Sequence, residues 1–430
     1  MASAWSYNEC GIVALVSRRL TAQIQWEFVT VTIPSFAKIN LGLRIGLSRE
    51  DGFHELRTVY QTIALRDTVS VSVERGSGIE IRCDDPRVPT GSPNTCFKTV
   101  EQAMRALKTR GRVVIKIEKR LPVQGGLGGA SANGVAALLA LELALRKNLP
   151  VAKRLRIAAE VGSDLPLFLI GGTVLGVGRG EEVYPLPDLP ATPCVIALPD
   201  IAISTPKAFG DWDRMCGAGA LARENNPGND LASNTTGKGT ASSRAEPRPK
   251  DRASAAEHSS ARTGEGARPH MVSPSHMVSP SHMAGASHMA DAKLTPSAHS
   301  DRMLKFSREI SAWLNAVPIT GGRRSGVSAR GGGRAENLLL DLVRTGIEND
   351  FERVVFPQYP ELLEVKRVLE KAGARYASLS GSGSAIYGLF DSSSQAAGAA
   401  KKLIRQGTRA LVTSTLTRRQ YWKKLLATSS

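Results

Sequence analysis

The sequence predicts an α+β protein of two domains, with a long segment of different composition inside the second. The chain has 430 residues, of which 42% are hydrophobic, and this suits two globular domains and an additional segment. Segments rich in β-branched residues are interspersed with amphipathic helical patterns. Residues 217–300 contain no Phe, Trp or Tyr and are rich in Ser, Ala, Gly, Pro and Thr, so we expect them to be disordered.

Composition limits the classes of function. The net charge of +17 suits a polyanionic partner, which is either a nucleic acid or a phosphorylated small molecule. Aromatic residues make up only 5% of the chain, which argues against a base-stacking surface. The five cysteines never show CxxC spacing, so reduced thiols and no zinc site are expected. No apolar run approaches the ~18 residues of a membrane span, so we predict a soluble cytoplasmic protein with no membrane partner.

Residues 1–28 show no clear periodicity and form a leader of uncertain order. The first domain is expected over 29–190. Segment 29–45 is rich in β-branched residues and predicts one or two strands. Lys38 and Asn40 are two positions apart there, so they share a face. A lysine in a strand usually lies at a solvated edge, but the apolar neighbours of Lys38 also allow it to point into a site.

The next elements are a strand set over 59–73, with a turn at Arg66-Asp67, a loop over 84–93 and a helix over 94–107. Asn94 is a plausible N-cap of that helix. His54 is the only histidine outside the segment 217–300, and a lone histidine is most often structural.

A glycine-rich segment then follows a strand over 113–119. It runs from Pro122 to Asn133, carries glycines at 125, 126, 128 and 129, and opens an Ala/Leu-rich helix. Such a loop favours phosphate, because its backbone can approach closely and the helix N-terminus attracts negative charge. The segment is not a Walker loop, since no Gly-Lys-Ser/Thr follows, and Ser131 replaces the third glycine of a dinucleotide fingerprint. A simple tight connection is the alternative.

Asp164 follows a helical segment over 151–161, within the sequence GSDLPLF. Most aspartates in turns are helix caps. The apolar residues after Asp164 instead predict a partly buried carboxylate, which needs a partner because unpaired burial is costly. Lys38 is the candidate partner. A strand and a tight turn are expected over 171–182.

The second domain is expected over 191–430, interrupted by 217–300. Within the interruption, His270, His276, His282 and His288 recur every six residues; a soft metal could bind there, but a repeat in a tolerant loop is the favoured interpretation. The Gly/Arg-rich loop 321–334 could contact RNA but is short and lacks aromatics. The predicted elements are strands over 193–203 and 409–416, helices over 204–215, 301–314, 336–352, 360–372 and 395–406, and two strands within 376–390 around a Gly/Ser turn.

Six stretches in a fixed order resemble the GHMP kinase superfamily and, within it, the family of 4-diphosphocytidyl-2-C-methyl-D-erythritol kinases. They are FAKINL (36–41), DGFHEL (51–56), 121–133, GSDLP (162–166), NDFE (349–352) and LSGSG (379–383). The resemblance covers about residues 31–216 and 301–418. It implies an N-terminal β/α ATP-binding domain and a C-terminal ferredoxin-like α/β domain.

The resemblance also implies an activity. It is ATP-dependent phosphorylation of the 2-hydroxyl of 4-(cytidine 5'-diphospho)-2-C-methyl-D-erythritol, a step of the non-mevalonate isoprenoid pathway, with Mg²⁺ as cofactor. A plastid location is the alternative where the source has one. Asp164 would accept the hydroxyl proton, and Lys38 would keep Asp164 ionised and stabilise the transferred phosphoryl group. Asn94 would lie near the adenine and Ser131 near Mg²⁺. The implied ATP-binding residues are Asn94, Pro122, Gly125, Gly126, Leu127, Gly128, Gly129, Ala130, Ser131, Ala132 and Asn133.

On the substrate side, the resemblance implies that Asn40 meets the methylerythritol and that His54 holds the cytosine edge. Phe53 and Phe209 would sandwich the base. The remaining implied substrate residues are Thr205, Gly381, Ser382 and Gly383. Two alternatives stay open. Another GHMP kinase, acting on a mevalonate-type, sugar or amino-alcohol substrate, would not need the His54 motif or Phe209. A nucleic-acid-binding protein is suggested by the net charge, but no nucleic acid partner is expected.

Overall fold

The computed structural model describes residues 29–217, 301–308, 310 and 347–427. The predicted leader, the interruption from 218 onward with its His-Met repeat, and the loop 321–334 lie outside the described residues. The described residues all belong to one compact unit, which contains two β-sheets. The division of this unit into domains at residue 190 remains a prediction.

The larger sheet has six strands, and their order is β3-β4-β2-β5-β6, with β1 paired to β2. Long alternating apolar stretches make β1 and β2 continuous antiparallel strands. The turn predicted at Arg66-Asp67 is wrong, because both residues lie inside β2 and Asp67 is fully buried. The strands are β1 (Val31–Ser48), β2 (His54–Glu74), β3 (Gly78–Cys83), β4 (Arg112–Glu118), β5 (Thr173–Val177) and β6 (Glu182–Pro185).

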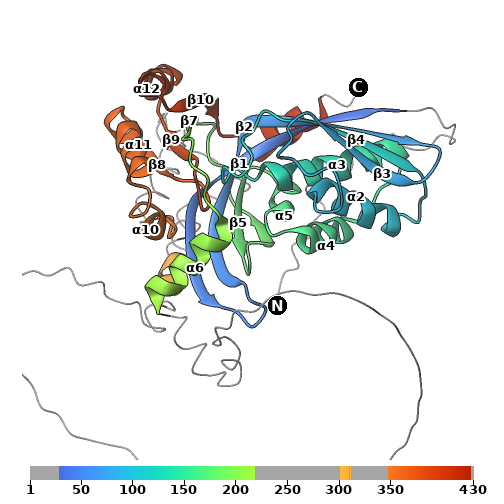
Figure 1. Cartoon of the computed structure of the whole chain (residues 1–430), viewed down its shortest axis with the longest axis horizontal. Coiled ribbons are helices and arrows are strands. Elements are labelled where there is room, and N and C mark those ends of the chain that lie inside the picture. Colours follow the sequence, from blue (N-terminus) through green and yellow to red (C-terminus); the bar gives the residue numbers. More distant parts are fainter. Residues whose placement is uncertain (1–28, 218–300, 309, 311–346, 428–430) are drawn as a thin grey trace, which may run out of the picture. The chain divides into compact units, whose positions relative to one another are not determined.

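Four helices gather beside this sheet: α2 (Thr95–Ala106), α3 (Gly129–Leu145), α4 (Val151–Val161) and α5 (Leu165–Phe168) (Figure 1). The central one, α3, is apolar around most of its circumference, as expected of a helix buried on several sides. Asn94 caps α2 as predicted, since its side chain accepts a hydrogen bond from the Cys96 amide.

The smaller sheet has the order β10-β7-β9-β8, and α11 and α12 lie against it (Figure 1). The helix α13 was missed by the sequence analysis, which ended the fold at the preceding strand. The elements of this half are β7 (Pro193–Leu198), α6 (Thr205–Cys216), α10 (Glu352–Val355), α11 (Pro360–Lys371), β8 (Tyr376–Leu379), β9 (Ile386–Leu389), α12 (Ser393–Arg405), β10 (Arg409–Ser414) and α13 (Arg418–Leu426). Residues 301–308 are also helical.

The helix predicted over 336–352 is wrong where the structure describes it. Residues 347–351 form a bridge and a turn, and a helix begins only at Glu352. The Asn349 side chain explains this. Its oxygen accepts from the Phe351 amide and its Nδ2 donates to the carbonyls of Leu379 and Gly381, both at 2.8 Å. Such side-chain bonds to the backbone favour turns over helix.

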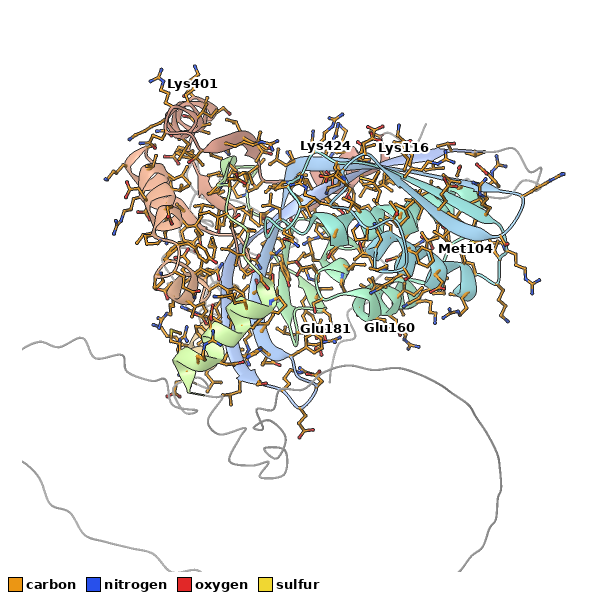
Figure 2. The ribbon with its side chains drawn as sticks, viewed as in Figure 1. Met104, Lys116, Glu160, Glu181, Lys401 and Lys424 are labelled. Carbon is orange, nitrogen blue, oxygen red and sulfur yellow. The ribbon has the colours of Figure 1, made fainter. Side chains whose placement is uncertain are left out.

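Backbone contacts join the two sheets. Leu43 of β1 forms a bridge with Asn349, and the Leu416 amide donates to the carbonyl of Thr62 at 2.9 Å. Basic side chains such as Lys116, Lys401 and Lys424 lie on β4, α12 and α13 respectively (Figure 2). These three lysines therefore lie on three different elements. In the described part of the chain, no helix is both long and apolar enough to cross a bilayer.

Candidate active site

Lys38 and Asp164 form the charged centre of the site. Nζ of Lys38 lies 3.2 Å from Oδ2 of Asp164. Lys38 is 3% exposed, whereas the Asp164 side chain is 31% exposed. Asp164 precedes α5 but makes no side-chain capping bond, so the simple cap interpretation is wrong. The structure thus confirms the prediction of a partly buried carboxylate paired with Lys38.

Irregularities in β1 set the position of Lys38. The register between β1 and β2 shifts between Phe36 and Lys38 and again between Asn40 and Gly42. Bulges of this kind change the direction in which a strand presents its side chains. The Lys38 amide donates to the carbonyl of Leu127 at 3.0 Å, so the strand is bonded to the glycine-rich segment 122–133, here called the glycine loop.

Two further side chains hold this centre, and the sequence analysis did not single them out. The Tyr60 hydroxyl donates to Oδ1 of Asp164 at 3.0 Å. Burial and the neighbouring Asp164 raise the pKa of Tyr60 well above its usual value, so this hydroxyl stays a donor. Asn40 accepts from Lys38 Nζ at 2.7 Å and donates to the Thr58 hydroxyl at 2.8 Å, which confirms that Lys38 and Asn40 share a face.

The glycine loop is bonded to the predicted Gly/Ser turn, residues 380–384, here called the glycine turn. The Ser380 hydroxyl donates to the carbonyl of Gly126 at 3.0 Å, and the Ala385 amide donates to the carbonyl of Gly125 at 3.3 Å. A Cβ added to Gly126 would lie 2.0 Å from the Ser380 carbonyl oxygen. Only glycine fits there, because φ of Gly126 is also +72°. Gly381 adjoins Asn40, so the two glycine segments meet beside Lys38.

A cavity of about 370 Å³ lies over the glycine loop. Its lining includes Asn94 and every predicted ATP-binding residue of the loop except Ala132. Ala132 is buried in the same hydrophobic cluster as Leu165 and Phe168. Arg87, Val88, Pro89 and Lys119 also line the cavity and were not predicted. The polar atoms of Asn94 are engaged locally, because Nδ2 donates to the Pro89 carbonyl at 2.6 Å and Oδ1 caps α2.

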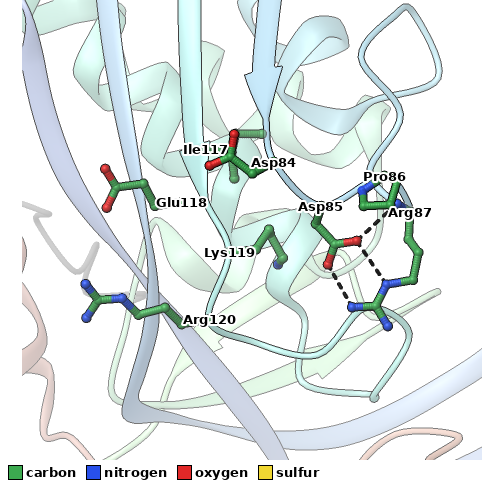
Figure 3. Close-up of a pocket in the computed structure, with 8 residues that line it drawn as sticks. All are labelled: Asp84, Asp85, Pro86, Arg87, Ile117, Glu118, Lys119 and Arg120. Carbon is green, nitrogen blue, oxygen red and sulfur yellow. Dashed lines mark hydrogen bonds and ion pairs between the residues drawn. The ribbon is translucent and has the colours of Figure 1, made fainter.

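A second depression of about 500 Å³ shares Arg87 and Lys119 with the first and is lined by charges of both signs (Figure 3). Its Arg87 guanidinium is bound by both oxygens of Asp85, at 2.7 and 2.9 Å (Figure 3). This contact lowers the pKa of Asp85 to about 2. Since Arg87 already has a carboxylate partner, the depression does not resemble a phosphate site.

Asp67 connects β2 to the start of the glycine loop. Its Oδ1 accepts from the backbone amides of Arg120 and Leu121 at 2.7 and 2.8 Å, and its Oδ2 accepts from Asn133 Nδ2 at 3.1 Å and pairs with Lys119. The Asp67 carboxylate is fully buried. It therefore fixes both ends of the glycine loop, which the local sequence could not reveal.

We predict that Asp67→Asn lowers the free energy of unfolding by about 3–5 kcal/mol, because it removes a buried charge that four donors share and leaves Lys119 buried without its partner. Urea unfolding measures this change. The matched control is Glu118→Gln, whose exposed side chain lies 3.4 Å from Lys116, and we expect a change within about 0.5 kcal/mol. Equal unfolding midpoints for the two variants would contradict the role given to Asp67.

The predicted substrate residues lie at the other end of the site. The His54 ring stacks on Phe209 with centroids 4.8 Å apart and planes at 15°. His54 thus covers one face of Phe209, while Phe53 is 49% exposed and its ring lies under Arg179. In this arrangement, the structure brings His54 rather than Phe53 against Phe209. Thr205 is brought to the glycine turn, with its hydroxyl 2.8 Å from that of Ser382.

The arrangement suits phosphoryl transfer to an alcohol. A backbone-lined cavity at a helix N-terminus can hold polyphosphate, and a lysine–carboxylate pair beside it can align and deprotonate a hydroxyl. Among the described residues, no group of three or more His, Cys, Asp or Glu side chains could hold a metal ion by itself.

Comparisons with known proteins agree with this chemistry. The family model described as GHMP kinases N terminal domain matches residues 94–172, and the one described as GHMP kinases C terminal matches 334–409. A solved structure titled 4-(cytidine 5'-diphospho)-2C-methyl-D-erythritol kinase has a TM-score of 0.53 at 24% identity and covers 89% of this chain and 98% of that one. The predicted two-domain α+β GHMP kinase fold is therefore confirmed.

Sequence relatives give the narrower family. A 4-diphosphocytidyl-2-C-methyl-D-erythritol kinase of Solibacter usitatus is 30% identical over 357 residues, which are 83% of this chain and 80% of that protein. A protein of the same name from Saccharopolyspora erythraea is 43% identical over 195 residues, which are 44% of this chain and 59% of that protein. The chain belongs to the 4-diphosphocytidyl-2-C-methyl-D-erythritol kinase family of the GHMP kinases.

Proposed function

We propose that this protein transfers the γ-phosphoryl group of ATP to the 2-hydroxyl of 4-(cytidine 5'-diphospho)-2-C-methyl-D-erythritol. The observation that carries the proposal is the ion pair of Lys38 with Asp164, 3.2 Å apart, beside the glycine loop. Family membership supports the choice of substrate. The reaction belongs to the non-mevalonate isoprenoid pathway.

Asp164 accepts the proton of the acceptor hydroxyl. One of its oxygens is held by Tyr60 and the other by Lys38, so the carboxylate keeps one orientation. A correctly oriented general base contributes about 10²–10⁴-fold to the rate. Lys38 is held by Asn40 as well as by Asp164, and its buried ammonium stabilises negative charge on the transferred group.

ATP occupies the cavity over the glycine loop, with its triphosphate against the backbone of residues 125–131 and its adenine towards Asn94 and Pro89. Mg²⁺ fits this site as an ion held largely by the phosphates, with the Ser131 hydroxyl as a neighbour. When bound, Mg²⁺ would neutralise charge on the phosphates.

The cytidine diphosphate end of the substrate lies towards His54, Phe53 and Phe209, and the methylerythritol lies near Asn40. The glycine turn and Thr205, linked through Ser382, close the site on the acceptor side. A different GHMP kinase substrate, without a base, would leave the stacked His54 and Phe209 rings without a ligand.

The test is ADP release by the purified protein with ATP and the cytidyl substrate, with mevalonate and homoserine as controls. We expect release only with the cytidyl compound. Equal or greater release with mevalonate or homoserine would replace the proposed substrate, and no release with any of the three would contradict the proposed activity.

We predict that His54→Ala raises the KM for the cytidyl substrate by roughly ten- to a hundredfold, the range expected for one lost hydrogen bond in a desolvated site. The KM for ATP should change by less than about twofold, because His54 does not line the cavity over the glycine loop. Steady-state kinetics with each substrate varied in turn measure both values. An unchanged KM for the cytidyl substrate would remove His54 from the base site.

A further inference from the structure

His54 is held by an acidic residue that sequence reasoning did not find. Nε2 of His54 lies 2.7 Å from Oδ1 of Asp213, and the two side chains are 7% and 31% exposed. His54 opens β2 and Asp213 lies in the last turn of α6. We propose that Asp213 is a positioning residue that determines specificity, because it fixes the tautomer of the histidine that reads the base. This inference rests on the proposed function.

The tautomer follows from hydrogen-bond chemistry. An ionised carboxylate can only accept hydrogen bonds, so Nε2 of His54 carries a proton and donates a hydrogen bond to Asp213. In the neutral ring, Nδ1 is then the acceptor. Cytosine carries an exocyclic amine, which donates, at the position where uracil carries a carbonyl oxygen, which accepts. An Nδ1 acceptor therefore matches cytosine and opposes uracil.

Packing fixes the orientation of the same ring. The His54 ring stacks on Phe209, and the edge of Phe351 meets Phe209 with centroids 4.9 Å apart and planes at 75°. The imidazole is thus held at one nitrogen by Asp213 and on one face by a supported aromatic ring. A ring held at these two points keeps one orientation, as a base-reading group requires.

The first test measures the tautomer directly and needs no substrate. In protein labelled with ¹⁵N-histidine, the signals that disappear in His54→Gln are assigned to His54. The other six histidines, which lie within 217–300, keep their signals in this variant. With the ring neutral, we expect Nδ1 of the wild type to show the shift of an unprotonated nitrogen and Nε2 that of a protonated one. Asp213→Asn should yield a mixture, because an amide can accept from or donate to Nε2. Identical spectra would overturn the proposal.

The second test measures discrimination. We expect Asp213→Asn to raise the KM for the cytidyl substrate about tenfold and to reduce the preference over the uridyl analogue by a similar factor, with kcat and the KM for ATP within about twofold. The matched control is Asp211→Asn, which removes the same charge from the same helix but bonds Lys207 at 2.9 Å rather than His54. Retained discrimination in Asp213→Asn, or the same loss in Asp211→Asn, would overturn the proposal.

The two tests separate this proposal from the function on which it rests. A wild-type protein that does not turn over the cytidyl substrate overturns the proposed function and, with it, the base-reading role of Asp213. A second combination of results overturns only the specificity role of Asp213. In it, the tautomer of His54 changes in Asp213→Asn and the wild type turns over the cytidyl substrate, but the wild type does not discriminate against the uridyl analogue.

Discussion

Asp164→Asn is expected to lower kcat by about 10²–10⁴-fold, because the amide cannot accept the proton of the acceptor hydroxyl. Affinity for ATP should stay within about threefold of the wild type, since Asp164 does not line the cavity over the glycine loop. Lys38 keeps its hydrogen bond to Asn40 in this variant, so the protein should still fold. ADP release measures the first effect and titration calorimetry with ATP the second.

Two controls sharpen this experiment. Asp200→Asn removes one exposed carboxylate and should leave kcat unchanged. Tyr60→Phe keeps the Asp164 carboxylate but removes the hydroxyl that orients it, so we expect a smaller loss than in Asp164→Asn. Wild-type turnover by Asp164→Asn would eliminate the residue as the general base.

Gly126→Ala is the second change for which we expect a large effect. The new methyl group would lie 2.0 Å from the Ser380 carbonyl oxygen, so the glycine loop and the glycine turn must separate. The left-handed backbone costs an additional ~1–2 kcal/mol. A displacement of about 1 Å in a positioned site can lower the rate about 10²-fold, and we expect a loss of that order together with a lower unfolding midpoint.

A control substitution, Gly373→Ala, separates the effect of the collision with the Ser380 carbonyl oxygen from the effect of the left-handed backbone. Gly373 has a φ of +90°, and a Cβ added there would meet no atom within 4 Å. Gly373→Ala therefore carries similar strain without the collision, and it should lower stability by about 1–2 kcal/mol while turnover stays near the wild type. Equal turnover in Gly126→Ala and Gly373→Ala would show that the contact between the two glycine segments does not matter for activity.

The charged centre could be predicted from the sequence because each residue stood out against its own neighbours. Asp164 is followed by an apolar run and was recognised as a carboxylate in need of a partner, and Lys38, which lies among apolar residues, was named as its candidate partner. The glycine loop was recognised from residue type and spacing alone. The structure then joined these separately predicted parts, with Lys38 bonded through its side chain to Asp164 and through its amide to Leu127.

The residues that support the site were missed because their partners are distant in the chain. Arg66-Asp67 is locally a turn signal, yet Asp67 is bonded to residues 119–121 and 133, more than 50 positions away. Asp213 lies 159 positions from His54. Asn349 sits in a helical pattern, but its bonds to Leu379 and Gly381 favour a turn. Local sequence patterns carry no information about such contacts.

In the proposed arrangement, the direct bonds between the glycine loop and the glycine turn would couple the binding of the two substrates. The Ser380 hydroxyl holds the Gly126 carbonyl, so the backbone proposed to border the nucleotide is bonded to the backbone proposed to border the acceptor. Any shift of the turn that acceptor binding produces changes the geometry offered to ATP. By linkage, the factor by which the acceptor changes ATP affinity equals the factor by which ATP changes acceptor affinity. We therefore expect the nucleotide affinity measured with the acceptor present to differ from the affinity measured without it.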